Sequence, residues 1–334
     1  FKIGTVAKPR VVDEVVDERA LREIYLKAFG MTVRDAAPYT IMSSYNLING
    51  TRVALSYDLL TTYLREECGF AGMVMPDWGS GGTVVEKVNA GNDLNMPGNA
   101  DDPDLILSAA KNGTLNMQML DRACANVLGL VVKCPAFTEI ERGGRIDYTA
   151  HGDLAAEVSA QTMVLLKNDS QALPLTEQKM LAVFGNGSFA TVYGGAGSGS
   201  VNAKKPVNIA DGLNKSEAFD VYQMSKHPFK NAKAHDAMDA SKDIPVSAEY
   251  AAECAQVADA AVIVISRGST EGADRVDMAG DFSLNQTETE MIERVSQAFR
   301  AKGKRVIVLL NTGSPIEMLS WQDMADAVLW TGYA

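Results

Sequence analysis

The sequence predicts an α/β protein built from two domains. Its 334 residues are too many for one ordinary hydrophobic core. Short apolar runs typical of buried strands alternate with longer amphipathic stretches typical of helices, and this alternation favours parallel sheets. Between the two halves, residues 136–153 combine glycines and mixed charge without periodicity, so we predict a linker there.

The first half, residues 1–135, opens with a predicted amphipathic helix in which Val16, Ala20 and Ile24 recur at i, i+4 spacing. The expected elements are a helix over 13–29, a strand over 40–45, a helix from an N-cap at Ser56 to a stop at Gly69, a strand ending before Asp77, a helix over 82–90, a short strand over 93–96 and a helix over 115–133. These make three or four β/α units, whereas a closed (β/α)8 TIM-type barrel needs eight. We therefore expect a partial barrel: either the chain is a fragment, or the missing units lie on another segment or chain.

The second half, residues 154–334, continues the alternation of strand and helix and predicts an α/β/α sandwich. Its expected elements are a helix near 154–165, strands over 180–184, 260–265, 306–310 and 327–330, and a helix over 286–302 that Thr287 and Glu290 begin with capping-box spacing. Residues 214–248 are polar and lysine-rich, so we predict a surface insertion there.

Composition excludes several classes of function. The formal net charge of −11 disfavours nucleic acid and anionic membrane as partners, and no apolar run is long enough to span a bilayer. The four cysteines lack CxxC spacing and only three histidines occur, which predicts reduced thiols, no metal site and no cofactor. No secretory signal is visible at residue 1, and the sequence assigns no cellular compartment.

The strongest indication of a catalytic site in the sequence is the pair Asp77–Trp78. The apolar run Met73–Met75 reads as a strand that ends on this carboxylate and indole, which is how parallel α/β barrels present catalytic groups. The combination suits a sugar, because the apolar face of the ring stacks on Trp while the acid reaches the reacting carbon. The alternative is an Asp that caps a loop beside a core Trp.

Two loops of the second half offer further candidates. Glu271 lies between glycines directly after the most apolar strand, where open α/β sheets bind ligands; the alternative is a solvated turn with an Asp274–Arg275 pair. The run from Gly194 to Gly199 allows either a weak dinucleotide loop or a flexible loop that reaches a polyol through Ser198. Motifs of P-loop nucleotide hydrolases, zinc proteases and serine hydrolases are absent.

Taken together, the motifs of this sequence resemble those of glycoside hydrolase family 3, and within that family those of the β-glucosidase branch. The resemblance rests on motifs that occur in the family's order over nearly the whole chain: residues 15–26, 42–46, 49–50, 77–78, 96–98, 164–168, 173–175, 195–199 and 271–275. Each motif is weak alone, and their ordered succession is a strong signal.

The resemblance implies a retaining exo-acting β-glucosidase. Asp77 would be the nucleophile that forms a glycosyl-enzyme, and Glu271 would be the acid/base from the second domain, which implies a cleft between domains. Trp78, Tyr45 and Met42 would line the −1 subsite, with Tyr45 also orienting Asp77. Ser198 and Arg10 would contact the sugar, and the substrate would be a β-glucoside or short oligosaccharide.

Two departures from the family pattern bear on activity. Pro76 replaces the usual serine before the nucleophile, and the family's upstream Asp, Arg and Lys-His sugar ligands have no counterpart in this sequence. Three alternatives therefore stay open: a β-xylosidase or other β-glycosidase of the same family, a non-catalytic carbohydrate-binding fragment, and a nucleotide-binding α/β protein that rests on the glycine loop alone.

Overall fold

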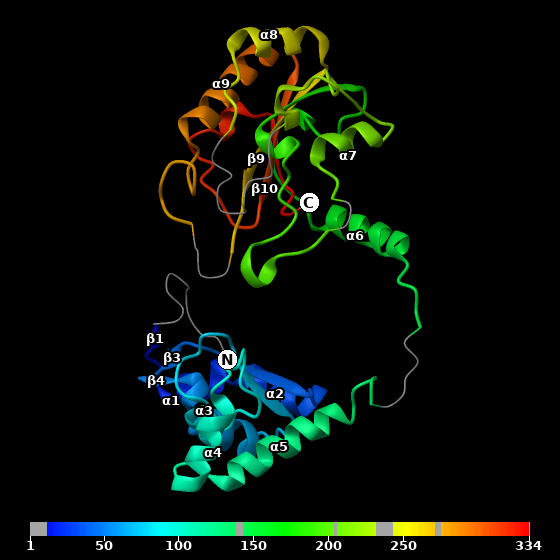
Figure 1. The fold of residues 1–334 in the computed structure, drawn as a ribbon. Helices are drawn as coiled ribbons and strands as arrows, with labels where there is room; N and C mark the ends of the chain where they lie inside the picture. Colours follow the sequence, from blue (N-terminus) through cyan, green and yellow to red (C-terminus); the bar gives the residue numbers. More distant parts are fainter. Residues whose placement is uncertain (1–11, 138–142, 204–205, 232–242, 271–274, 334) are drawn as a thin grey trace. The chain divides into compact units, whose positions relative to one another are not determined.

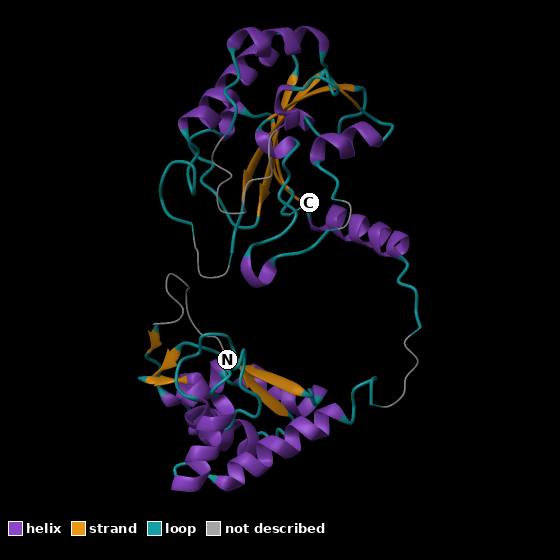
Figure 2. Cartoon of the chain, in the orientation of Figure 1, coloured by secondary structure: helices purple, strands orange, loops and turns teal. Residues whose placement is uncertain are grey.

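The chain divides into two compact units, Phe1–Arg145 and Ile146–Ala334 (Figure 1). The computed structural model describes residues 12–137, 143–203, 206–231, 243–270 and 275–333. Both units combine helices with parallel strands, so the predicted α/β class is confirmed (Figure 2).

The first unit pairs β2 with β5 in parallel, from Thr40 opposite Met73 to Ser43 opposite Pro76. Among the described residues it also has a small three-stranded sheet of order β1-β3-β4. The elements of this unit are β1 (Asp13–Glu14), α1 (Glu18–Ala20), η1 (Leu21–Tyr25), α2 (Lys27–Ala36), β2 (Thr40–Ser43), β3 (Leu47–Ile48), β4 (Thr51–Arg52), η2 (Val53–Leu55), η3 (Asp58–Glu67), β5 (Met73–Pro76), α3 (Val84–Ala90), α4 (Asp102–Asn112) and α5 (Met117–Val131).

The first helix differs from its prediction in start and in buried face. Asp17 caps it by accepting a hydrogen bond from the Ala20 N–H at 2.9 Å, so the helical turns start at residue 18 rather than 13. A wider π turn follows, in which the Leu26 N–H donates to the Leu21 carbonyl at 2.8 Å. The extra residue turns Leu21 and Leu26 into the core and leaves Ile24 exposed, whereas Val16 packs against the core as expected.

Two further expectations for this unit need correction. Residues 93–96 form no strand, because the N–H groups of Asp93 and Leu94 both donate to the single carbonyl of Val74 and make a turn instead of a ladder. Helix α4 was not predicted from the sequence, although acids in its first turn and Gly113 after its end are ordinary helix signals.

The second unit is built on one six-stranded sheet of the described residues, with order β6-β11-β10-β9-β7-β8. All neighbours are parallel except β6, which runs antiparallel to β11. The elements are α6 (Tyr148–Thr162), β6 (Val164–Asn168), η4 (Asp169–Gln171), β7 (Met180–Phe184), η5 (Asn186–Ser188), η6 (Gly197–Gly199), α7 (Ile209–Lys215), β8 (Asp220–Val221), η7 (Pro228–Asn231), α8 (Ala248–Val257), β9 (Ala260–Arg267), α9 (Gln286–Arg300), β10 (Arg305–Thr312), η8 (Gln322–Met324) and β11 (Ala327–Trp330).

The central strand β9 is buried on both faces of this sheet. Its Ile263 and Ile265 pack into one hydrophobic cluster with α8 and α9, which lie side by side (Figure 1). Its Val262 and Val264 point the other way, into a cluster that includes residues of α7. Burial on both faces explains why β9 reads as a continuous apolar run.

Three details of the second unit differ from expectation. Helix α6 begins at Tyr148, inside the stretch 136–153 that was predicted as a linker. The capping box of α9 uses Asn285 and Glu288 instead of Thr287 and Glu290. Residues 214–248 are more than a surface insertion, because Phe229 and other side chains of this stretch are buried in the core; residues 232–242 lie outside the described part.

Candidate active site

Asp77 follows β5 directly and is half-buried. Its backbone N–H donates to the Ser43 carbonyl at 2.8 Å, which joins it to the carboxyl end of the neighbouring strand β2. Its Oδ1 accepts a hydrogen bond from the Trp78 N–H at 2.6 Å, which orients the carboxylate. The sheet therefore presents the carboxylate where parallel α/β folds place reactive groups.

The side chains predicted around Asp77 differ in exposure. Trp78 is 60% exposed and Met42, on β2, is 55% exposed, so both have apolar surface available to a ligand. Tyr45 is only 4% exposed, and its carbonyl accepts a hydrogen bond from Arg52 at 2.9 Å. The first unit thus brings Met42, Tyr45, Asp77 and Trp78 to the ends of β2 and β5, while the ligand-wall role of each stays a prediction.

A buried asparagine that the sequence analysis missed supports this strand end. The Oδ1 of Asn92 accepts a hydrogen bond from the Ser43 hydroxyl at 2.8 Å, and its Nδ2 donates to the Ala54 carbonyl at 2.7 Å. Asn92 is only 1% exposed, and its two hydrogen bonds hold the end of β2 in place from the interior of the unit. Its position directly after Gly91, the residue that ends α3, was the one local signal for it.

In the second unit, Ser198 lies in the short helix η6, within the glycine-rich loop. This loop lies beside the chain that leaves β9: Ala196 and Thr270 form a parallel β-bridge, and the Ala196 N–H donates to the Ser269 carbonyl at 3.0 Å. Glu271 is the next residue after Thr270. Glu271 and Arg10, both predicted site residues, lie outside the described residues.

A group of buried polar residues lies beneath these loops, at the carboxyl ends of the strands. Asn311, fully buried, accepts a hydrogen bond from the Ser266 hydroxyl at 3.0 Å and donates to the carbonyls of Val192 and Gly332. Asp243 accepts a hydrogen bond from the Asn186 N–H, and burial raises the pKa of its carboxyl to about 7. The contacts of Asn311 join the carboxyl ends of β9 and β10 to the chain that precedes the glycine-rich loop.

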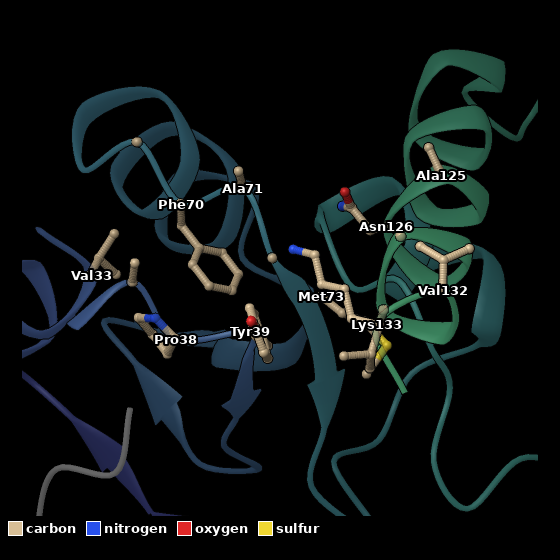
Figure 3. A pocket seen from close by; sticks show the side chains of 15 residues that line it. Val33, Pro38, Tyr39, Phe70, Ala71, Met73, Ala125, Asn126, Val132 and Lys133 are labelled. Atoms are coloured by element: carbon tan, nitrogen blue, oxygen red, sulfur yellow. The ribbon is translucent and has the colours of Figure 1, made fainter. Parts of the chain in front are cut away.

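The pocket in Figure 3 lies at the opposite end of the strands in the first unit. Its volume is about 460 Å³, and its walls include Tyr39 before β2 and Gly72 before β5. The Lys133 ammonium lies 4.6 Å from the centre of the Tyr39 ring. Asp77 follows the far end of β5, a strand of roughly 13 Å. The pocket is therefore separate from the candidate active site.

Within the described residues, no group of His, Cys, Asp and Glu side chains is arranged to hold a metal ion. The side chains of Cys68, Cys124 and Cys254 are free thiols. None of the helices in the described part combines the length and apolar character needed to cross a bilayer.

Comparison with known proteins identifies relatives for both units. Family models of the glycosyl hydrolase family 3 N-terminal and C-terminal domains match residues 9–130 and 163–334. The chain is 32% identical over 332 residues to an exo-α-(1→6)-L-arabinopyranosidase of Bifidobacterium breve, covering 95% of this chain and 41% of that protein. It is 32% identical over 319 residues to thermostable β-glucosidase B of Acetivibrio thermocellus, covering 95% and 40%.

Among solved structures, the chain is similar to β-glucosidase 3B from Thermotoga neapolitana in complex with α-D-glucose. The TM-score is 0.87 at 38% identity, and the alignment covers 97% of this chain and 48% of that chain. The chain therefore spans less than half the length of these relatives.

Proposed function

The chain belongs to glycoside hydrolase family 3, and on that premise we propose that it carries the two catalytic carboxylates of a retaining, exo-acting β-glucosidase. The substrate is a terminal, non-reducing β-D-glucosyl residue of a glucoside or short oligosaccharide. The observation that carries the proposal is Asp77, presented at the end of β5 beside the exposed indole of Trp78.

The proposed reaction has two steps. Asp77 attacks the anomeric carbon as the glycosidic C–O bond breaks, and Glu271 gives its proton to the departing oxygen. Glu271 then takes a proton from water, whose oxygen attacks the same carbon and displaces Asp77, so both carboxyl groups return to their first state. Retention requires the two carboxyl groups to lie roughly 5–5.5 Å apart in the working enzyme.

Sugar binding is assigned to the remaining predicted residues. Trp78, Tyr45 and Met42 line the −1 subsite around the sugar ring, and Tyr45 also orients Asp77. Ser198 and Arg10 contact the sugar hydroxyls. Hydrogen bonds to these hydroxyls strengthen in the transition state, so their loss is expected to lower kcat as well as affinity.

At the level of domains, we propose that residues 1–135 form the later part of a TIM-type barrel and that residues 154–334 form an α/β/α sandwich. Parallel pairing of β2 with β5, and a parallel sheet with helix clusters on both faces, support this assignment. Helix α5 exposes Leu128 and Val131, and its C-cap residue Val132 is exposed beside them; a further barrel segment would cover such apolar surface.

The proposed site has more than one candidate sugar substrate within the family. The arabinopyranosidase similarity favours a second candidate within the family, because arabinopyranose and xylose lack the hydroxymethyl group of glucose. The ratio of kcat/KM on aryl β-glucoside, aryl β-xyloside and aryl α-L-arabinopyranoside decides between them. A preference above about tenfold for glucoside supports glucosidase.

The proposal is tested by intact mass after incubation with a 2-deoxy-2-fluoro-glucosyl inactivator, followed by peptide mapping. A stoichiometric adduct on Asp77 is expected, and Asp77→Asn should lose both the adduct and turnover. An adduct on another carboxylate would contradict the assignment. Glucose-dependent thermal stabilisation without any adduct would favour the non-catalytic, carbohydrate-binding alternative.

A further inference from the structure

A cluster of charged side chains lies inside the first unit, beside β5. The buried Asp93 carboxylate accepts hydrogen bonds at Oδ2 from Nη2 of Arg65 at 2.5 Å and from the Val74 N–H at 2.7 Å. Its Oδ1 accepts a hydrogen bond from the side-chain amide of Asn126 on α5 at 3.0 Å (Figure 3). Both oxygens of the carboxylate are therefore already engaged.

Arg122 of α5 adds a second guanidinium group to this cluster. It lies one helical turn before Asn126, so the two side chains share a face of α5. Its charge acts on Arg65: the pKa of Arg65 is lowered first by burial and, against the opposite effect of Asp93, by the nearby positive charge of Arg122. Two guanidinium groups thus face one carboxylate, which leaves one positive charge in excess.

One edge of the Arg122 guanidinium is buried and unpaired. Within the described residues, neither Nε nor Nη2 of Arg122 has a hydrogen-bond acceptor, and Nε of Arg65 has none either. The Nε and Nη2 edge carries two parallel N–H groups that match two oxygens of a carboxylate or phosphate. Arg34 uses this edge in the same unit, where Nε and Nη2 donate to the two oxygens of Asp35 at 2.7 and 3.0 Å.

An unpaired edge of this kind is costly to bury. A buried N–H without an acceptor loses the hydrogen bond that water gives it in the unfolded chain, and a buried charge without a counter-ion loses more. A water molecule would supply an acceptor but no charge. An oxyanion supplies two acceptors and also neutralises the excess positive charge, so it fits the site better.

We propose that Arg122 binds an oxyanion through its Nε and Nη2 edge, with Arg65 as the second cation of the site. The ligand is a carboxylate or a phosphate-like group whose two oxygens accept the pair of hydrogen bonds. Its source is either a free ion or an acidic side chain of a further polypeptide segment. The bound oxyanion links α5 to η3, and it takes no part in the proposed glycosidase reaction.

The test replaces Arg122 by methionine, which keeps the apolar stem of the side chain and removes the guanidinium. Thermal unfolding of the full chain is compared in sodium chloride and in sodium phosphate of equal ionic strength. The matched control, Arg34→Met, removes an exposed guanidinium that already has its partner in Asp35. It should change Tm by less than about 2 °C in either salt.

The two salts distinguish the sources of the oxyanion. If a free ion fills the site, phosphate should raise the Tm of the wild type by more than about 3 °C over chloride and should not raise that of Arg122→Met. If an acidic side chain fills it, Arg122→Met should lower Tm by more than about 5 °C in both salts, because the acid is left without its counter-ion. A smaller loss, or a gain, in both salts together with no effect of phosphate on the wild type would overturn the proposal.

A second measurement does not depend on stability. The Nε–H signal of Arg122 in a proton–nitrogen correlation spectrum is assigned by its loss in Arg122→Met. A hydrogen bond to an oxyanion should slow exchange of this proton with water by at least about tenfold relative to a free guanidinium. Phosphate should shift the signal only if a free ion fills the site. Exchange as fast as in free arginine, in both salts, would refute the proposal.

Discussion

Arg267 and Glu288 are joined by two parallel hydrogen bonds, of 2.5 Å between Nη1 and Oε1 and 2.7 Å between Nη2 and Oε2. Both side chains are almost completely buried. The pair connects the end of β9 to the first turn of α9, because Glu288 also accepts a hydrogen bond from the Asn285 N–H in the capping box. Arg267 is the last residue of β9, and residues 268–270 connect it to the proposed acid/base.

We expect Glu288→Gln to lower the free energy of unfolding by about 3–5 kcal/mol, because it leaves the Arg267 guanidinium buried without its counter-ion. The matched control is Glu290→Gln, which removes a partly exposed i, i+4 pair with Arg294 and should cost no more than about 0.5 kcal/mol. Urea unfolding of the two variants measures the difference. Similar losses of unfolding free energy in both variants would show that the buried pair stabilises the protein no more than the exposed pair.

Asp243 predicts a pH dependence of stability. Its pKa is raised to about 7 in the folded protein by burial, against 3.8 for an ordinary Asp. Between about pH 4 and 7 the folded state therefore holds a proton that the unfolded chain has lost, and stability due to this group falls as pH rises. Glu288 nearby acts in the same direction, and Arg267 opposes it.

Asp243→Asn should remove that decline, so its stability relative to wild type should increase from pH 4 to 7 and then level off. Thermal unfolding across this range measures the effect. Glu86→Gln is the control of opposite sign: hydrogen bonds from Thr83 lower the Glu86 pKa, so its stabilising contribution is lost as pH falls. Parallel pH profiles for wild type and Asp243→Asn would contradict the assignment.

Trp78→Ala should weaken substrate binding without unfolding the protein. The side chain is 60% exposed, so its removal should change the free energy of unfolding by no more than about 0.5 kcal/mol. We expect KM for aryl glucoside to rise about tenfold, because the sugar loses its apolar platform. The contrasting variant is Trp321→Ala, which empties a fully buried site and should destabilise by about 3–5 kcal/mol. An unchanged KM in Trp78→Ala would remove Trp78 from the subsite.

Two glycine-to-alanine substitutions should have opposite effects. Gly313→Ala drives a methyl group into the Tyr333 ring and the Ser269 hydroxyl, so it should destabilise the second unit by about 1–3 kcal/mol. Gly129, inside α5, has no atom within 4 Å of an added Cβ, and Gly129→Ala should stabilise by about 0.5–1 kcal/mol. Differential scanning calorimetry gives both values. Destabilisation by Gly129→Ala would show that the neighbouring residues leave no room for an added methyl group at this position.

Local patterns predicted much of the fold correctly. Strands β7 and β11 have the predicted bounds, and β5 ends before Asp77 as expected, because an apolar run between turn residues is a local signal. The prediction that the apolar stripe of the first helix continues through Ile24 was wrong, because a π turn places Leu21 and Leu26 in the core instead, without a clear mark in the sequence.

The sequence by itself determined the α/β class, the family resemblance and the strand that presents Asp77, since each depends on short local motifs or on their order along the chain. Only the tertiary structure decided which polar side chains support the strand ends. Asn92 bonds to Ser43 across 49 residues, and Thr270 bonds to Ala196 across 74. No local periodicity encodes such pairs, because a hydrogen bond depends on distance in space, and folding brings these residues together.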